Sequence, residues 1–498
     1  MTCAAAAWLG ACATPLPDGA ARPPVPAWNS SAPVDGSPTR IGQAESLTEY
    51  PGDPPRPYPA SGLWTLEDCV NRALSASRGI LDAEVATLSA DYSIAAAQSA
   101  FELRLFPAAS ASTTSGPGQN DVITAGFDLV KRTRTGATVN LSPSVSRSSG
   151  EYAGGYVAGI TQPLLRGRQR EFVENALDGS RYFARATRRS LYLSQVNTTL
   201  STVSGVMAVV RLRESLRLNE ESAERSLGHV RAARARERAG LASSLDVVRA
   251  NQQATRAADG LNTARQAYGD ALDSLRLLLA LPLDVPLVVE APLIVEDIHI
   301  GPEEALRLAI ANRVELLQAQ DDLDEALRRS RVAAIDTQPD LDLNLSVAQF
   351  GSGSTLGDGL ELDGPSLTVG LGSTSDLWRT AERARLAQTR LSAQVVRRRQ
   401  ELTRDQVVRD VRGALRDLER DTERIALQET QVDQATGKLR AARIKFERGI
   451  ATNFDVIEAE EELRSAEISL ITAVAATIVD GYALRAALGT LVERPTDL

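Results

Sequence analysis

Side chains that commonly carry enzymatic chemistry or bind metals are scarce in this sequence. The 498 residues contain two isolated histidines, His229 and His299, and three scattered cysteines, Cys3, Cys12 and Cys69. Three cysteines at these spacings fit neither a disulfide framework nor a zinc site. The sequence also has no glycine-rich phosphate-binding motif and no metal-ligand spacing. We therefore expect a protein that is not an enzyme and that binds no cofactor and no metal.

One cysteine has a sequence context that indicates a covalent modification. Leu9-Gly10-Ala11-Cys12 resembles the lipobox of bacterial lipoproteins, in which the cysteine is acylated, for example with palmitate. Residues 1–12 then form a leader. This leader is shorter than a signal peptide, so a start upstream of Met1 stays open. The alternative is a chance cysteine in an alanine-rich segment.

Two carboxylates stand at a spacing that places them on one face of a helix. Asp455 and Glu458 are three residues apart. They lie in a stretch, residues 447–459, that repeats residues 238–250 with an offset of 209 positions. In both copies a glycine follows one helical pattern, and a Ser or Thr with an Asp three residues later opens the next. Each stretch therefore predicts a tight turn between two helices, and the chain is built from two similar halves.

The elements around these turns follow the same order twice. Twelve of the 23 prolines fall within residues 13–62, which predicts an extended tether. The first repeat, 63–281, contains a helix 63–106, a β-hairpin region 108–165, a long helix 169–239 and a helix 244–281. A connector, 282–301, leads to the second repeat, 302–489, with a helix 302–338, a β-hairpin 340–374, a long helix 380–448 and a helix 453–488. Residues 490–498 form a tail.

The strands predicted in the two hairpin regions alternate apolar and polar side chains. In the second region Leu341, Leu343 and Leu345 alternate with Asp342 and Asn344. In the first region the patterns within 139–145 and 156–162 give two strands, and 127–130 is either a further strand or a loop. A polar face rich in Ser, Thr, Asn and Gly favours the wall of a membrane barrel over an ordinary soluble hairpin. About four strands cannot close a barrel, whose smallest form has about eight, so several chains must share it.

Composition and apolar spacing indicate which kinds of binding and membrane insertion are open to this protein. The net charge of −9 argues against binding to nucleic acid, which requires a basic face. No run of about 18 consecutive apolar residues predicts a membrane-spanning helix. Residues spaced seven apart in the long helices, such as Val411, Leu418 and Leu439, predict coiled-coil packing. If the chain spans a bilayer, it does so with strands.

The order of helix, hairpin, long helix, glycine turn and shorter helix, occurring twice, resembles the outer-membrane efflux proteins related to the TolC channel. The resemblance covers roughly residues 63–489. It rests on the two turns (240–250 and 449–459), the segment Ile160-Thr161-Gln162-Pro163-Leu164-Leu165-Arg166-Gly167 and the connector from Leu281-Pro282 to Pro292-Leu293. The first hairpin region is longer than the family minimum.

The resemblance implies a mainly α fold with a transmembrane β-barrel portion. Three copies form a twelve-stranded barrel in the outer membrane, continued by a long α-helical barrel across the periplasm. Such proteins are the passive exit ducts of tripartite efflux pumps or type I secretion systems. A periplasmic adaptor (membrane fusion) protein joins them to an inner-membrane transporter of RND or ABC type. The cargo stays open among drugs, metal ions, polysaccharide and protein.

The resemblance also implies roles for both turns, which it places at the periplasmic end. Asp455 and Glu458 would surround the aperture, where a ring of carboxylates attracts cations. The alternative is that Asp455 caps its helix and Glu458 is a solvated charge. The adaptor would dock on eight turn residues, whose other possible role is turn formation and packing: Gly240, Leu241, Ser244, Leu245, Gly449, Ile450, Asn453 and Phe454.

One competing class fits the heptads alone. A soluble periplasmic coiled-coil scaffold without channel activity would show the same spacing of apolar residues. A channel should sediment with outer membranes and run as a heat-modifiable oligomer, whereas a scaffold should stay in solution.

Overall fold

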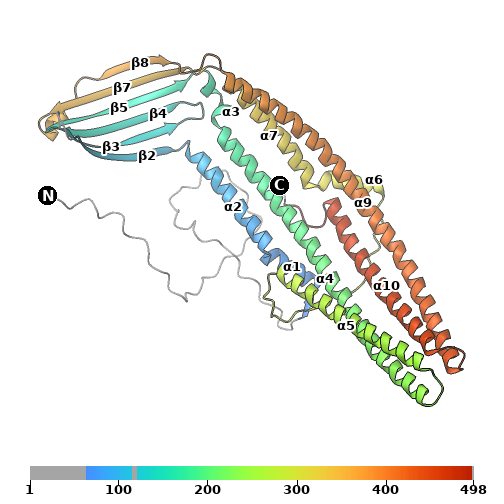
Figure 1. Ribbon diagram of the computed structural model, residues 1–498. Coiled ribbons are helices and arrows are strands. Elements are labelled where there is room, and N and C mark those ends of the chain that lie inside the picture. The colour runs from blue at the N-terminus through green and yellow to red at the C-terminus, as the bar shows by residue number, and fades with distance from the viewer. Residues whose placement is uncertain (1–62, 115–119, 496–498) are drawn as a thin grey trace, which may run out of the picture. The chain divides into compact units, whose positions relative to one another are not determined.

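The structure is a computed structural model that describes residues 63–114 and 120–495. Cys12, the leader 1–12 and the proline-rich segment 13–62 lie outside the described residues. The described chain is mainly helical, with one six-stranded antiparallel sheet and a two-stranded parallel one (Figure 1).

The helix that opens each repeat is broken, where the sequence predicted single helices over 63–106 and 302–338. In the first repeat α1 (Leu66–Ala76) and α2 (Arg78–Ser99) meet at Ser77. In the second, α6 (Pro302–Asn312) and α7 (Val314–Asp336) meet at Arg313. Ser77 and Arg313 both have extended backbone, with ψ of 130° and 116°. The prediction of unbroken helices was wrong because a one-residue break leaves the apolar periodicity almost unchanged.

The long helices are close to their predicted positions. After a 3₁₀ turn, η2 (Arg166–Arg168), and a short helix, α3 (Arg170–Val173), α4 spans Asn175–Arg238 and α5 spans Ser244–Leu278. In the second repeat α9 spans Thr380–Glu447 and α10 spans Asn453–Leu488. α10 is the one helix among the described residues that is long and apolar enough to cross a membrane, by length and composition alone. It packs along α9 and α4, as a helix of a bundle does.

The sheet contains six strands, where about four were predicted. They are β2 (Leu103–Thr114), β3 (Asn120–Arg132), β4 (Thr138–Ser148), β5 (Glu151–Pro163), β7 (Asp342–Gly353) and β8 (Ser366–Gly372), with the one-turn helix α8 (Leu356–Gly359) between the last two. The strand order is β2-β3-β4-β5-β7-β8, antiparallel throughout. The region 108–165 therefore supplies two hairpins, and 127–130 lies inside a strand. Pro107, the residue between the predicted helix 63–106 and the predicted hairpin region 108–165, lies within β2. β2 is an edge strand, where a missing N–H is tolerated.

The register gives the sheet one apolar and one polar face. Leu105 pairs with Leu129, Leu129 with Leu141, and Ile160 with Leu345, so apolar side chains align across the strands. Several of them are exposed, among them Leu103, Leu105, Ile123, Phe127, Ile160, Leu345, Leu367 and Val369. Ser, Thr, Asn and Gly dominate the opposite face. The described chain leaves the apolar face uncovered, as in the lipid-facing wall of a barrel.

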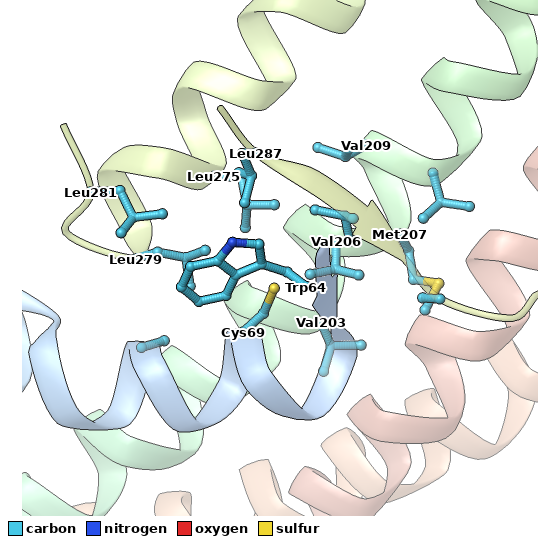
Figure 2. Close-up of a cluster of buried hydrophobic side chains, with 14 of the residues drawn as sticks. Trp64, Cys69, Val203, Val206, Met207, Val209, Leu275, Leu279, Leu281 and Leu287 are labelled. Atoms are coloured by element: carbon cyan, nitrogen blue, oxygen red, sulfur yellow. The ribbon is translucent and has the colours of Figure 1, made fainter. Parts of the chain in front are cut away.

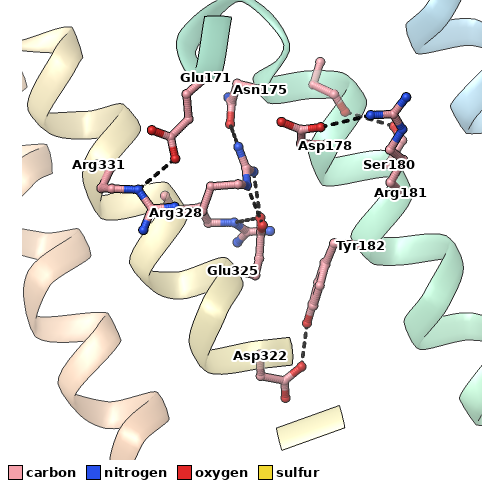
Figure 3. Close-up of polar contacts among 12 residues, drawn as sticks. Glu171, Asn175, Asp178, Ser180, Arg181, Tyr182, Asp322, Glu325, Arg328 and Arg331 are labelled. Atoms are coloured by element: carbon pink, nitrogen blue, oxygen red, sulfur yellow. Dashed lines mark hydrogen bonds and ion pairs between the residues drawn. The ribbon is translucent and has the colours of Figure 1, made fainter. Parts of the chain in front are cut away.

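The short helices pack along the long ones. In the first repeat α2 and α5 contact α4, and in the second repeat α7 and α10 contact α9 (Figure 1). α10 also contacts α4, across the repeats. Polar contacts join α4 to α7 close to the sheet (Figure 3): the Tyr182 hydroxyl donates to Asp322 at 2.7 Å, and Arg328 donates to Asn175 at 2.9 Å. Burial together with the Asp322 carboxylate raises the pKa of Tyr182 to about 12.

The largest apolar cluster lies where the connector returns to the first repeat. Strand β1 (Leu63–Thr65) pairs in parallel with β6 (Val288–Glu290). Trp64 from β1 and Cys69 from α1 pack with Leu275 of α5 and with Leu279, the C-cap residue of that helix (Figure 2). Burial raises the pKa of the Cys69 thiol to about 12, so this cysteine is a small apolar core residue.

Candidate functional site

The two glycine turns have the same backbone structure. Gly240 and Gly449 have φ of 70° and 75°, the left-handed region in which glycine carries no Cβ penalty. Leu241 N–H donates to Arg236 C=O at 2.8 Å, and Ile450 N–H donates to Lys445 C=O at 2.9 Å. Together with the glycine N–H bonds, these contacts form a Schellman motif at the end of α4 and of α9.

Each turn then opens its next helix with a capping box. Ser243 N–H donates to Asp246 at 3.0 Å, and Thr452 N–H donates to Asp455 at 2.6 Å. In return the Asp246 and Asp455 amides each donate to the Ser or Thr hydroxyl at 3.3 Å. Hydrogen bonds from Thr452 lower the pKa of Asp455. Asp455 therefore caps α10, as Asp246 caps α5, and this structural role is present whether or not Asp455 also lines an aperture.

The apolar residue that follows each glycine is exposed. Leu241 is 75% exposed and Ile450 is 74% exposed. In a Schellman motif this residue often packs back on the third residue before the cap. Here those residues are Arg236 and Lys445, which carry charged side chains. Leu245 and Phe454 are also exposed, and each turn presents an apolar surface that the described chain does not cover.

The other predicted turn residues lie under or beside this surface. Gly240 and Gly449 are exposed, and a Cβ added to either would meet no neighbouring atom. Ser244 is exposed, whereas the side-chain amide of Asn453, the equivalent residue, is buried and has no hydrogen-bond partner. Beneath each turn lies a small apolar cluster. Val230, Ala233 and Ala250 form the first, and Leu439, Ala442, Val456 and Ala459 form the second.

The two carboxylates predicted to line an aperture have different partners. Asp455 is held by Thr452, whereas Glu458 lies 3.6 Å from Lys438 of α9. Lys438 also pairs with Glu462. Both predicted carboxylates are exposed at the turn, but in this conformation each is engaged within its own hairpin.

The sequence analysis missed a third carboxylate, Glu460, which joins the two repeats. Glu460 lies 2.9 Å from His229 Nε2 of α4 and accepts from Arg443 of α9 at 2.8 Å. Its side chain is 13% exposed. Although burial opposes ionisation, the His229 and Arg443 contacts lower the pKa of Glu460 to about 2. His229 and Glu460 are 231 residues apart, so no local pattern connects them.

A second group of acids lies between α9 and α10, farther from the turns. Asp480 lines a cavity of about 670 Å³ together with Asp417 and Arg313. Burial, followed by the nearby Asp421 carboxylate, raises the pKa of Asp480 to about 6. In the part of the chain that the structure describes, no group of three or more His, Cys, Asp or Glu side chains could hold a metal ion.

Among known proteins, a family model matches the second repeat of this chain. Residues 305–490 match the family model of outer membrane efflux proteins. The outer membrane efflux protein BepC of Brucella suis biovar 1 (strain 1330) is 24% identical over 311 residues, which cover 61% of this chain and 66% of BepC. The chain thus spans just under two thirds of that relative's length.

Solved structures extend the similarity to the described chain. VceC of Vibrio cholerae matches with a TM-score of 0.67 and 17% identity, covering 85% of this chain and 96% of that one. The CmeC outer membrane channel of Campylobacter jejuni has a TM-score of 0.68 at 13% identity, covering 86% of each chain. The open MtrE outer membrane channel of Neisseria gonorrhoeae has a TM-score of 0.65 at 18% identity, covering 86% of this chain and 89% of that one.

These similarities confirm the resemblance to the TolC-related outer-membrane efflux proteins. They also confirm the predicted fold class, mainly α with an antiparallel sheet of the kind found in outer-membrane channels. The family model and the solved structures that match describe outer membrane efflux proteins and channels, not soluble scaffolds.

Proposed function

We propose that this chain, whose second repeat matches the outer membrane efflux family, is the outer-membrane channel of a tripartite efflux pump or a type I secretion system. Three copies enclose a passive duct through the outer membrane of a Gram-negative-type bacterium and across the periplasm. The chain catalyses no reaction. Its alternative cargoes are drugs, metal ions, polysaccharide and protein.

The sheet carries this proposal. Within residues 63–114 and 120–495 its apolar face is uncovered, and its two outer strands, β2 and β8, have no neighbouring strand on one side. In lipid an open strand edge leaves backbone groups unpaired at a cost of several kcal/mol each, so the edges require other copies of the chain. α4 and α9 have 64 and 68 residues, so each continues the proposed duct for about 100 Å beyond the sheet.

Membrane fractionation and electrical recording test the channel. The protein should sediment with outer membranes, run as a heat-modifiable trimer and give discrete conductance steps in planar bilayers. A monomer that stays soluble after cell breakage would favour the scaffold and contradict the channel.

We assign the exposed turn surface to the periplasmic adaptor, which links the channel to an inner-membrane transporter of RND or ABC type. Replacing Leu241 or Ile450 with Asp should abolish crosslinking to the adaptor while trimers persist. Leu427→Asp is the matched control. Leu427 is 69% exposed and lies on α9, about 30 Å from the end of that helix at the second turn. Loss of trimers in the turn variants would instead assign these residues to packing.

We assign the aperture to the second turn, where three copies bring together Asp455 and Glu458. Asp455→Asn keeps an oxygen that can cap the helix, and Glu458→Gln keeps the shape of the side chain. The double variant should lower the cation selectivity of single channels, whereas Asp246→Asn in the first turn should not. Unchanged selectivity would leave Asp455 as a cap only.

The lipid anchor is a separate proposal. Acylation of Cys12 would attach the chain to outer-membrane lipid through the proline-rich segment 13–62, which can extend by about 3.1 Å per residue. Labelling with radioactive palmitate should mark the parent and not Cys12→Ser. Equal labelling of both would contradict the assignment.

A further inference from the structure

The first repeat contributes an additional hairpin to the sheet. By chain order, α2 leads into β2, β5 into α3 and α4, α7 into β7, and β8 into α9. Each of these four strands is therefore joined to a helix. β3 and β4 are joined only to other strands, so they add width to the sheet without adding a helix.

The side-chain pattern places β3 and β4 in the wall of the sheet. Ile123, Phe127 and Leu129 of β3 share a face with Val139 and Leu141 of β4. The register continues this apolar face into β5, β7 and β8. The opposite face of β4 is an unbroken polar series, Thr138, Asn140, Ser142, Ser144, Ser146 and Ser148. A hairpin folded into a water-filled lumen would have no reason to keep one continuous apolar face.

The inner turn of this hairpin is fixed against the helices. Gly136 has φ of 84°, and a Cβ built there would collide with the Gly167 carbonyl. Gln162 donates to the Thr135 carbonyl at 3.3 Å, and Arg134 lies 3.2 Å from the nearly buried Glu174 at the start of α4. The turn thus reaches the level at which β5 passes into the helical region.

The width of the sheet matches the width of the helical layer. Strands spaced by about 4.8 Å and tilted by about 40° each take about 6 Å of circumference, so six span about 37 Å. The helices form four columns, α4, α9, α2 with α5, and α7 with α10, which at about 9 Å spacing span about 36 Å. Four strands would span only about 25 Å.

We propose that three copies of this chain close an eighteen-stranded barrel, in which β8 of one copy pairs with β2 of the next and β3–β4 supplies the additional wall. This inference rests on the proposed channel function and concerns its width. The barrel is about 1.5 times as wide as a twelve-stranded one, since diameter grows roughly linearly with strand number. It falls in the range of barrels that hold an open aqueous channel. The outer-membrane exit then admits cargo as wide as the helical duct delivers, and selection by size belongs to the turns.

An electron cryo-microscopy reconstruction of the full chain in lipid nanodiscs tests the proposal directly. Eighteen strands around a threefold axis are expected. A trimer with twelve wall strands and β3–β4 folded away from the wall would overturn this inference and leave the channel function standing. A dimer closing twelve strands would also overturn it. A water-soluble monomer would overturn both.

A deletion of residues 120–148 gives a second test. It removes β3 and β4 and joins the outer end of β2 to that of β5, leaving every helix and both glycine turns. The largest polyethylene glycol that enters from the extracellular side should fall about 1.5-fold in diameter. An unchanged exclusion size in inserted trimers would show that β3–β4 is not part of the wall. If the deletion variant fails to insert, the reconstruction of the parent protein still decides between eighteen and twelve wall strands.

Discussion

The two glycine turns share a backbone and differ in charge. At the offset of 209, Arg234 and Asn251 of the first turn correspond to Arg443 and Glu460 of the second. Both pairs are in contact, Arg234 with Asn251 at 3.3 Å and Arg443 with Glu460 at 2.8 Å. The neutral amide of the first pair stays within its hairpin, whereas the carboxylate of the second also reaches His229 in the other repeat.

The same contrast extends along the helix after each turn. Arg249, Gln252 and Gln253 of the first repeat are replaced by the acids Glu458, Glu461 and Glu462 in the second, by the same offset. Glu458 and Glu462 pair with Lys438, and Glu461 pairs with Arg464. The duplicated unit therefore kept the residues that form its backbone turn. It diverged in the charges that determine what the turn contacts.

The largest change in stability is expected when Glu460 is replaced by a neutral amide, as Asn251 is at the equivalent position of the first turn. Glu460→Gln should lower the free energy of local opening around the turn by about 2 kcal/mol, because the variant loses a largely buried charged contact. The folded pKa of about 2 lies below the ordinary 4.5. The stabilisation is therefore present above about pH 4.5 and lost as the pH falls toward 2. Hydrogen exchange between pH 7 and pH 3 should show this loss in the parent only.

Glu462→Gln is the matched control for that variant. Glu462 is 47% exposed and pairs with a lysine that is itself 48% exposed, so its removal should change hydrogen exchange little. Equal effects of the two substitutions would mean that Glu460 has no special role in joining the repeats.

Replacing Asp480 should change stability by less than replacing Glu460, and it should stabilise the protein rather than destabilise it. Its equivalent in the first repeat is Ala271, and that of Asp421 is Leu212, so only the second repeat places two acids together. The raised pKa of about 6 means that protonation favours the folded state. The ionised pair therefore costs stability above about pH 6, and the cost disappears as the pH falls toward 4. Asp417 adds to this effect, and Arg420 opposes it.

Asp480→Asn should stabilise the protein by about 1.5 kcal/mol at pH 7.5, a value reduced for solvent screening of the partly exposed group. At pH 4 it should have no effect. Thermal unfolding at the two pH values checks this prediction, with Ala271→Asn as the equivalent change in the first repeat. A gain that is the same at both pH values would assign the effect to packing rather than to charge.

The capping boxes should give equal effects in the two turns. Ser243→Ala and Thr452→Ala each remove the hydroxyl that accepts the amide hydrogen bond of the capping Asp. Each should cost about 1 kcal/mol of local stability, measured by hydrogen exchange in the first turn of α5 or α10. Clearly unequal losses would show that the shared backbone hides a difference in energy.

The smallest effect on stability is expected at Lys438, whose equivalent is His229. Lys438→Gln should leave thermal unfolding unchanged, because its ion pairs are exposed. It should raise the cation selectivity of single channels, since it frees Glu458 and Glu462 at the second turn. Arg249→Gln in the first turn is the control, and a fall in cation selectivity would contradict the proposed aperture.

The sequence was sufficient where structure depends on neighbouring residues. The glycine, the Ser or Thr and the Asp of each turn are within seven positions of one another, and they predicted both the tight glycine turn and the capping box. The long helices followed from heptads such as Val411, Leu418 and Leu439, which are buried in the structure.

The sequence was insufficient where structure depends on distant partners. β2 contains Pro107 and a run of Ala and Ser, which have low strand propensity, and its pairing with β3 gives it its structure. The segment 127–130 was open between a strand and a loop, and its pairing within β3 with both β2 and β4 makes it a strand. Lys438 and Glu458 meet only after the hairpin folds, and His229 and Glu460 meet only after the repeats pack together.

The parallel pairing of β1 with β6 bears on the order in which the polypeptide matures. Leu63–Thr65, the first described residues, are matched with Val288–Glu290, more than 200 positions later. On the proposed function the chain is secreted from its N-terminus, so Trp64 has no partner strand until the whole first repeat has followed. Enclosure of the Trp64 indole therefore marks the moment at which that repeat is complete, and its fluorescence offers a clock for biogenesis.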